Sequence, residues 1–486
     1  MSASDAASSA PAADEGSTRF PPLLRRVVLV TVLGSIMSFL DATIVNVALQ
    51  SLSQHMDASL ATIQWVVTAY LLGLAAVIPV SGWAATRFGA KQMYVLSIAL
   101  FTLASLACGL AQNAGQLIAF RAVQGAAGGL TLPIAQMITV RTAGPARLAR
   151  VMSVSGIPTL LAPVFGPALG GLLLEHASWH WIFFVNVPIG VLTVVLAQRM
   201  IPADEGRRAA GKLDVPGLAA VSLGFVALTY GLAQIGSKGR ADSPAVLASL
   251  AVGALLIAGF VLYALRAERP LVDVRLFKNK LYSAAQLTNF CLGSAVFGSI
   301  ILMPLYFQTV RGEDPTATGL LLIPQGIGAG LAMVMSARLV EKLGAGLTAC
   351  AGGVVSIVAT VPFMMIGSGT SYWLLGAAMV ARGFGIGACT IPATTAAYRA
   401  VPPTGVNDAT VQIGVLQRVG GSTGTALFAV VLQDRLTSAT GHAGQAAAFG
   451  TAFWWVLGAA ALATVPTLLL TSAERRAAKA AVPQPA

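Results

Sequence analysis

Apolar segments long enough to cross a membrane recur along this chain, and short loops with Gly, Pro or charged residues separate them. An α-helix needs about 20 residues to cross the hydrocarbon core of a bilayer. We predict fourteen such segments, near residues 27–48, 63–84, 93–111, 117–138, 151–174, 180–200, 214–235, 244–265, 283–308, 318–340, 347–367, 372–393, 407–432 and 449–471. Only 10% of the 486 residues are charged, against about 25% in a soluble domain. The sequence therefore predicts an all-α polytopic membrane protein.

The second half of the chain repeats part of the first. The stretches SGWAATRFGAK (81–91) and SARLVEKLGAG (336–346) lie 255 residues apart, and each carries a basic residue two positions before a Gly-Ala pair. This offset covers eight spans, so we expect two pseudo-symmetric six-helix bundles, with the seventh and eighth spans inserted outside the central cavity. The predicted domains are a disordered cytoplasmic tail (1–21), an N-terminal six-helix bundle (22–200), inserted helices 7 and 8 (201–265), a cytoplasmic basic interfacial linker (266–282), a C-terminal six-helix bundle (283–472) and a second disordered cytoplasmic tail (473–486).

The basic residues, which give a net charge of +12, fall mostly on one side of the predicted membrane. Of the 30 Lys and Arg residues, 23 lie in the tails and in the loops on the same side as the tails, four in the opposite loops and three inside spans. A nucleic-acid-binding protein would gather them on one exposed face instead. Because basic loops mark the cytoplasmic side, we expect a multi-pass protein of the inner (plasma) membrane with both termini cytoplasmic and no nucleic-acid partner.

The residue inventory favours a transporter over a membrane enzyme. All four histidines (His55, His176, His180 and His442) fall in or beside the outward loops, which leaves no histidine at membrane depth to bind a metal or relay protons. The four cysteines lack pairing or metal-ligand spacing. No GxxxxGK[ST] phosphate loop is present, so we expect no cofactor and no ATP hydrolysis, and an ion gradient remains as the energy source. A lipid-modifying membrane enzyme is the remote alternative.

One carboxylate lies deep inside an apolar segment. Asp41, in the stretch SFLDATIVNVAL, lies about fifteen residues beyond the inner interface, which puts it about 22 Å into a core of about 30 Å. Thr31, Ser35 and Ser38 share its helical face. A charge at this depth is costly and is normally paired or faces water. Asp41 is therefore half of a structural ion pair or a group that takes up and releases a proton, and we favour the second role.

Arg121 is the natural partner of Asp41. It lies about 7.5 Å below the outer face if the fourth span begins near Gln116, which matches the depth of Asp41. An arginine stays charged at any relevant pH, so it can hold the acid ionised until a proton or substrate competes. The alternative is that Arg121 only ties helices together.

A separate segment, APVFGPALGGLL (162–173), combines prolines and small residues, which predicts a kinked, tightly packed helix and leaves a hinge role open.

At this point the chain resembles a known family. The stretches LDATIVNVAL, QWVVTAYLL, GWAATRFGAK, FRAVQGAAGG, GPALGG, WHWIFFVNVPIG, PLVDVRLFKNK and MPLYFQ together resemble the fourteen-span drug:proton antiporter branch of the major facilitator superfamily. The resemblance covers nearly everything except the tails. It implies that Asp41 and Arg121 couple transport to protons. It also assigns an antiporter motif (Gly166, Pro167, Gly170, Gly171) and an inner-gate loop (Gly82, Arg87, Gly89, Lys91).

Two departures from the family pattern fall in the inner-gate loop. Thr86 stands where the family usually has an acid, and Ala90 replaces a usual basic residue. We therefore expect the charge lock between this loop and the second half to be weak, with Glu341 and Lys342 sharing its task.

The resemblance implies a proton-driven exporter of hydrophobic or aromatic small molecules such as drugs and antibiotics, working by alternating access in the lipid bilayer. In the expected cycle Asp41 takes a proton from outside, its pairing with Arg121 weakens, and the bundles shift toward the cytoplasm. Export of a lipid or endogenous metabolite, or proton-coupled import, remains an alternative.

The substrate cavity is expected among polar and aromatic residues inside spans. Each of them is equally able to serve as a packing or interhelical hydrogen-bond residue. The candidates are Trp65, Gln124, Asn289, Gln325, Arg382, Gln417 and Arg418. Because three arginines and one acid lie inside spans, a neutral or weakly anionic aromatic substrate remains open beside a cationic one.

Overall fold

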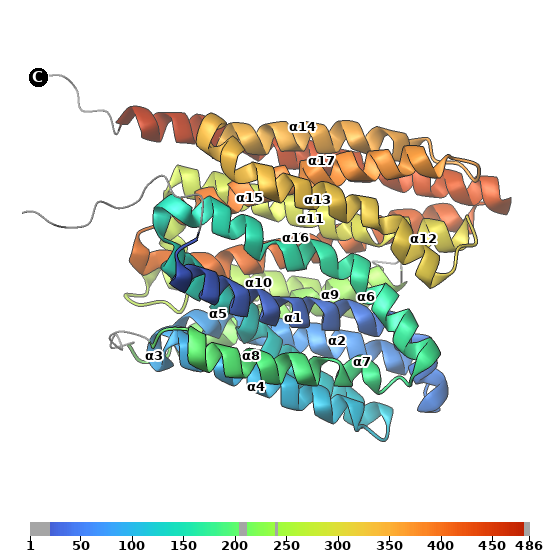
Figure 1. The fold of residues 1–486 in the computed structure, drawn as a ribbon, viewed down its shortest axis with the longest axis horizontal. Helices are drawn as coiled ribbons and strands as arrows, with labels where there is room; N and C mark the ends of the chain where they lie inside the picture. The colour runs from blue at the N-terminus through green and yellow to red at the C-terminus, as the bar shows by residue number, and fades with distance from the viewer. Residues whose placement is uncertain (1–19, 204–210, 239–241, 481–486) are drawn as a thin grey trace, which may run out of the picture.

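The computed structural model describes residues 20–203, 211–238 and 242–480. Within these ranges all regular structure is helical, and the long helices lie side by side along one direction (Figure 1). Thirteen described segments are long and apolar enough to span a membrane. Together with the 20-residue helix Ile157–His176, they correspond one to one with the predicted spans. The first predicted tail, apart from residues 20 and 21, lies outside the described residues.

The helices fall into two groups of six spans separated by an inserted pair. The N-terminal bundle consists of α1 (Pro22–His55), α2 (Leu60–Val77), η1 (Ile78–Val80), α3 (Ser81–Phe88), α4 (Ala90–Gly109), α5 (Ala114–Ser155), α6 (Ile157–His176), α7 (Trp181–Phe184) and α8 (Asn186–Met200). The inserted pair is α9 (Val215–Lys238) and α10 (Pro244–Arg266). The short helix η2 (Val274–Lys278) leads to the C-terminal bundle of α11 (Lys280–Ile300), α12 (Leu302–Thr309), α13 (Pro315–Leu343), α14 (Ala345–Met364), α15 (Tyr372–Arg399), η3 (Pro403–Gly405), α16 (Val406–Thr437) and α17 (Gly441–Ala480).

Two glycines mark the internal repeat in the backbone itself. Gly89 ends α3 with φ 95° and ψ 137°, and Gly344 ends α13 with φ 85° and ψ 163°. They lie 255 residues apart, at the offset predicted from the sequence. Because a positive φ strains any residue with a Cβ atom, the repeated Gly-Ala pair is explained by a turn that both halves need.

Two segment boundaries differ from the prediction. The fourth and fifth spans are joined without a loop, because α5 continues to Ser155 through a single non-helical residue, Gly144 at φ 65° and ψ 173°. The expectation of a disordered tail from residue 473 is wrong for residues 473–480, which continue α17 as a helix. Ala- and charge-rich sequence favours helix once a preceding span has nucleated it. Residues 481–486 lie outside the described residues.

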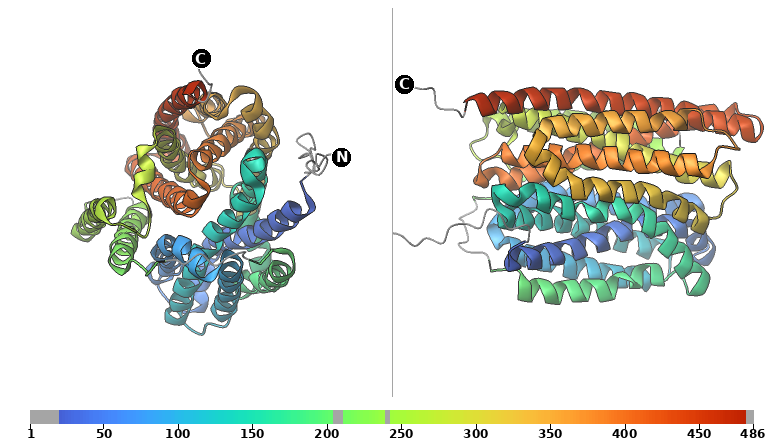
Figure 2. Two further views of the ribbon diagram at one scale, coloured as in Figure 1. Left: turned by 90° about the vertical axis from the view of Figure 1, so that its left-hand side faces the viewer. Right: turned by 45° about the horizontal axis from the view of Figure 1, so that its top comes forward.

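The two bundles meet at one end of the molecule and separate at the other. Both termini of the described chain lie at the same end (Figures 1 and 2), here called the termini end. There, one apolar cluster joins residues of α1 and α5 with residues of α11, α13, α15 and α16. At the opposite end, here called the far end, each bundle has its own apolar cluster. The molecule is therefore closed at the termini end.

The inserted pair packs against the side of the two bundles (Figure 2, left). On α9, Ser222 donates a hydrogen bond of 2.7 Å to the carbonyl of Ala76 on α2. The ring of Tyr230 stacks on Trp65 at 6.0 Å, and Ile235 joins an apolar cluster with Ala426 of α16. Helix α9 therefore touches both bundles. The expectation that both inserted spans lie outside the cavity is wrong for α9, which forms part of its wall; an apolar helix pattern does not distinguish lipid from a cavity.

Candidate functional site

A buried polar network surrounds Asp41, halfway along α1. Asp41 has no exposed surface, and Arg121 of α5 is 1% exposed. The Arg121 Nη1 atom lies 2.7 Å from Asp41 Oδ2. The second carboxylate oxygen accepts hydrogen bonds of 2.9 Å from the side-chain amides of Gln124 and Asn186. A charged group can persist in an apolar interior only when it is paired and hydrogen-bonded in this way.

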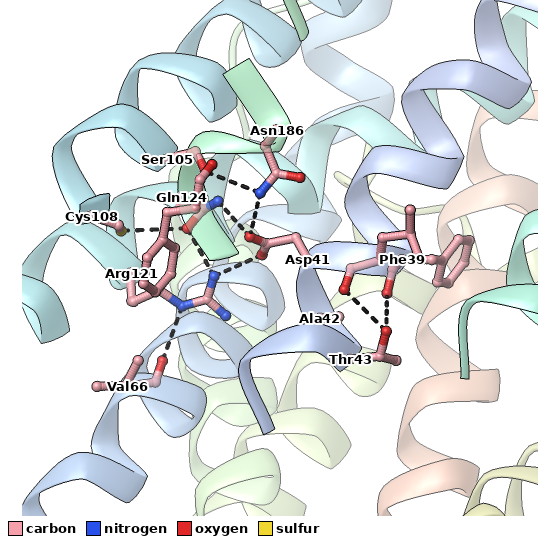
Figure 3. Close-up of polar contacts among 12 residues, drawn as sticks. Phe39, Asp41, Ala42, Thr43, Val66, Ser105, Cys108, Arg121, Gln124 and Asn186 are labelled. Carbon is pink, nitrogen blue, oxygen red and sulfur yellow. Dashed lines mark hydrogen bonds and ion pairs between the residues drawn. The ribbon is translucent and has the colours of Figure 1, made fainter. Parts of the chain in front are cut away.

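The Arg121 guanidinium has hydrogen-bond and ring contacts in addition to its pair with Asp41. Besides Asp41, its Nη1 donates to Gln124 Oε1 at 2.8 Å and its Nε donates to the carbonyl of Val66 at 3.3 Å. The guanidinium lies over the ring of Tyr70, 4.2 Å from the ring centroid, where a cation–π interaction adds to its stabilisation. Helices α1, α2 and α5 are thus joined through one side chain (Figure 3).

Asn186 connects the network to α4 and α7. The Asn186 amide that donates to Asp41 also donates to Ser105 Oγ at 3.0 Å, and Ser105 donates to the carbonyl of Phe183 at 2.9 Å. The sequence analysis did not assign roles to Asn186 or Ser105. One signal was available for Asn186, which lies in the stretch WHWIFFVNVPIG as a polar residue inside an apolar span.

Asp41 faces away from the large central cavity. That cavity has a volume of about 870 Å³ and is lined by residues of both bundles and of α9. The α1 residues Phe39, Ala42 and Thr43 line it, whereas Asp41 does not. Figure 3 shows the Asp41 side chain on one side of α1 and Phe39 and Thr43 on the other. The coupling candidate and the cavity therefore share one helix.

The polar stripe predicted below Asp41 is hydrogen-bonded within its own helix and, at Thr31, to Thr139 of α5. Thr31, Ser35 and Ser38 each donate to a carbonyl four residues earlier, at 2.9, 2.8 and 3.1 Å. Thr31 and Ser35 line the cavity. Thr31 and Ser35 therefore add polar residues to the cavity lining. The hydrogen bonds donated by the three hydroxyls do not reach Asp41.

Of the seven candidate cavity residues, Trp65, Gln417 and Arg418 line the cavity. The expectation is not met for the other four. Gln124 belongs to the Asp41 network, and Arg382 lines a separate small space. Asn289 lies behind the wall, where its Oδ1 accepts from Thr394 at 3.1 Å and from Gln417 at 3.3 Å. The Gln325 carbonyl packs at the contact between α13 and α15. A polar residue in a span can face the cavity, a neighbouring helix or a second polar group, and the sequence of the span does not determine which.

The GPALGG stretch lies in α6 and packs closely on α1. A methyl group built on Gly166 would lie 2.0 Å from Thr43 Oγ1, and one built on Gly170 would lie 3.1 Å from both the Ile44 carbonyl oxygen and Ile44 Cγ1. Gly171 is partly buried. Pro167 lies in α6, and its side chain is outside the described residues. The motif glycines therefore allow α6 to contact α1 two to three residues beyond Asp41.

The inner-gate loop makes a neutral contact with the second half. The Asn407 amide of α16 donates to Thr86 Oγ1 at 2.8 Å and to the Gly82 carbonyl at 3.3 Å. The hydroxyl of Thr86 thus has a defined partner where the family pattern has an acid. These bonds cross between the bundles at the termini end.

Of the charged residues in the gate region, Lys91 binds within its own bundle, and the other three are exposed. Arg87 is exposed, and Lys91 donates to the carbonyls of Gln198 and Ile201 at the end of α8, at 2.8 and 2.6 Å. Glu341 and Lys342 are exposed on α13. In the second half, the repeated Gly-Ala turn is instead bound by the carboxylate of Glu474, which accepts from the amides of Ala345 and Gly346 at 3.0 and 2.8 Å. The expected role of Glu341 and Lys342 in the gate remains a prediction.

The sequence is similar to known transport and resistance proteins. The profile of the Major Facilitator Superfamily matches residues 31–428. A Mycobacterium tuberculosis (strain ATCC 25618 / H37Rv) protein named multidrug resistance protein B homolog is 38% identical over 422 residues, which cover 84% of this chain and 76% of that protein. The methylenomycin A resistance protein of Bacillus subtilis (strain 168) is 32% identical over 428 residues, which cover 87% of this chain and 90% of that protein.

Solved structures share the fold. The crystal structure of the human organic anion transporter MFSD10 (TETRAN) aligns with a TM-score of 0.63 at 16% identity and covers 93% of this chain and 100% of that chain. The proton:xylose symporter XylE, bound to 6-bromo-6-deoxy-D-glucose, aligns with a TM-score of 0.61 at 14% identity and covers 91% of this chain and 94% of that chain. At these identities the likeness concerns the fold alone.

Proposed function

This chain belongs to the Major Facilitator Superfamily and is a transporter rather than an enzyme, and we propose that it exports hydrophobic or aromatic small molecules from the cytoplasm in exchange for protons. The names of two relatives, a multidrug resistance protein B homolog and a methylenomycin A resistance protein, support antibiotic or drug-like substrates. The observation that carries the proposal is the buried pair of Asp41 on α1 and Arg121 on α5, on the opposite side of α1 from a large cavity.

The cavity wall supports an aromatic substrate that is neutral or carries a negative charge. Trp65, Phe39, Phe225 and Phe297 contribute aromatic surface to the lining. In the described part of the chain the lining includes no Asp or Glu, and Arg418 is its one charged side chain. A volume of about 870 Å³ is in the range of pockets that hold drug-sized ligands. A cation would meet Arg418 with no acid to offset the repulsion.

The two sides of α1 support the proposed proton coupling. Protonation of Asp41 would replace its charged contact with Arg121 by a weaker neutral one, which loosens the attachment of α1 to α5. Because Phe39, Ala42 and Thr43 of the same helix line the cavity, a shift of α1 would change the substrate site. The close contact at Gly166 would carry the same shift to α6.

The proposed orientation puts the termini end in the cytoplasm, as the excess of basic loops at that end favours. The state described here is then closed toward the cytoplasm, with the bundles apart on the outer side. In this state Asp41 would receive a proton from outside. Substrate binding from the cytoplasm would follow once the termini end opens.

Transport by purified protein in proteoliposomes with an imposed pH gradient tests the proposal. We expect gradient-driven movement of neutral and anionic aromatic compounds opposite to the proton flux. Asp41→Asn should lose this coupled transport and still bind substrate, because the amide keeps hydrogen bonds to Gln124 and Asn186 but carries no titrating proton. Asp434→Asn is the matched control, since Asp434 belongs to an exposed ion pair.

Three outcomes would contradict the proposal. Full gradient-driven transport by Asp41→Asn would remove Asp41 from coupling. Movement of substrate in the same direction as protons would make the protein an importer. Transport of lipids with no transport of aromatic solutes would make it a lipid exporter on the same scaffold.

A further inference from the structure

Arg382 is a buried cation without a carboxylate partner. It lies inside α15 and is 2% exposed. Its Nη2 atom donates to Ser299 Oγ on α11, and its Nε atom has no hydrogen-bond partner. In the described part of the chain the one buried ion pair is Arg121–Asp41, so no acid neutralises Arg382. A buried charge without a counter-charge is strongly unfavourable.

A small space is lined in part by Arg382. Its volume is about 10 Å³, enough for the centre of one water-sized particle. The residues that line it include four with polar side chains, Arg382, Ser356, Thr360 and Thr464. Leu292, Val296 and Ile386 line both this space and the large cavity, and so separate the two.

The pseudo-symmetry of the molecule indicates what belongs there. A methyl group built on Gly125 of α5 would lie 2.0 Å from the Tyr70 carbonyl of α2, and one built on Gly383 of α15 would lie 2.1 Å from the Gln325 carbonyl of α13. The two glycines therefore occupy equivalent helix contacts, and the residues just before them, Gln124 and Arg382, are equivalent positions.

The two equivalent positions differ in their partners. Gln124 donates to the carboxylate of Asp41 at 2.9 Å, so in the N-terminal bundle a built-in anion receives this hydrogen bond. In the C-terminal bundle, the one hydrogen-bond partner of Arg382 among the described residues is the Ser299 hydroxyl. The C-terminal bundle thus has the positive charge and a small space beside it, and no acid among its described residues pairs with that charge.

We propose that the space beside Arg382 binds a monatomic anion, with chloride as the physiological occupant. The anion supplies the negative charge that Asp41 supplies in the N-terminal bundle. The Arg382 Nε–H donates to it, and Ser356 and Thr464 are among the residues that line the same space. The bound anion neutralises Arg382 and joins α15 to α14 and α17.

Thermal unfolding of the purified protein tests this site without any transport assay. The wild-type Tm is measured in sodium chloride and in sodium gluconate at equal ionic strength. We expect chloride to raise Tm, on the order of 2 °C per tenfold increase in concentration once the site is mostly filled. Ser299→Asp, which supplies a carboxylate beside Arg382, should unfold at the same temperature in both salts. The matched variant Ser299→Asn should keep the chloride dependence.

Crystals soaked in bromide give an independent readout. An anomalous peak beside Arg382 is expected in the wild type and should be absent in Ser299→Asp. Equal Tm in chloride and gluconate together with no bromide peak would mean that the space holds water only, and would overturn the proposal. An unchanged chloride effect in both Ser299→Asp and Arg382→Gln would place the anion elsewhere and overturn it too. If Arg382→Gln does not fold, the Ser299 pair and the bromide peak decide.

Discussion

At the scale of single residues, the pairing of Asp41 with Arg121 was predictable because the helical rise fixes the depth of each residue in its span. Gln124 was predicted to lie in the substrate cavity. Its spacing of three residues from Arg121 puts both on one face of α5, which would have been a better guide. Asn186 and Ser105 reach the same network from α8 and α4. Only tertiary packing brings these distant positions together, and no local pattern in the sequence records it.

Arg418 is predicted to select for negatively charged substrates. It is the one charged side chain among the described residues that line the cavity. Arg418→Gln should weaken binding of a carboxylated aromatic compound about tenfold, which corresponds to about 1.4 kcal/mol, and leave its neutral methyl ester unaffected. Arg418→Lys, which keeps the charge, should retain most of the preference. Binding of the acid and ester pair to detergent-purified protein measures this, and equal losses for acid and ester would contradict it.

At the scale of helices, fourteen spans and their order followed from apolar length, since nothing else satisfies backbone hydrogen bonds in lipid. The faces of the helices did not follow. The sequence of α9 predicts an ordinary apolar span, yet Thr229 and Gln234 on it line the cavity. Which face of α9 meets the cavity depends on its contacts with the two bundles. The junction at Gly144 was also missed, since one residue with a positive φ replaces the expected loop.

The contact between α6 and α1 is predicted to tolerate no side chain at Gly166. A Cβ atom there would lie 2.0 Å from Thr43 Oγ1 and 2.7 Å from Thr43 Cβ. Gly166→Ala should therefore separate the two helices and lower stability by about 1–3 kcal/mol, the usual range for overpacking. Gly259→Ala on α10 is the control, because nothing lies within 4 Å of its Cβ position and alanine favours helix. Thermal unfolding and transport by both variants provide the comparison, and an unaffected Gly166→Ala protein would refute the close contact.

At the scale of the whole molecule, the two-bundle architecture was predictable from the 255-residue repeat, whereas the conformational state was not. A transporter of this kind visits closed and open states with one sequence, and the balance depends on interface contacts. Here a shared apolar cluster and the Asn407 hydrogen bonds hold the bundles together at the termini end. These hydrogen bonds join uncharged groups, so this contact between the inner-gate loop and α16 contains no charge pair.

Asn407 is predicted to favour closure of the termini end. Removing a hydrogen bond between neutral groups costs about 0.5–1.5 kcal/mol, so Asn407→Ala should raise the fraction open at this end several-fold. Thr86→Val should act in the same direction, and the double variant should open little more than Asn407→Ala alone, because both changes remove the same 2.8 Å hydrogen bond and Asn407→Ala also removes the bond to the Gly82 carbonyl. Distances between spin labels placed on α3 and α16 report the opening. Fully additive effects would show that the two residues act separately.

The position of Asp41 behind α1 has a consequence for kinetics. A proton bound there and a molecule held in the cavity touch opposite sides of one helix, so neither displaces the other. If coupling works as proposed, the proton and the drug are two co-substrates linked through α1 and do not compete for one site. Raising the drug concentration would then change the maximal exchange rate and its pH dependence together. In double-reciprocal plots, the lines measured at different external pH would not share an intercept on the reciprocal-rate axis, as they would for competitive inhibition.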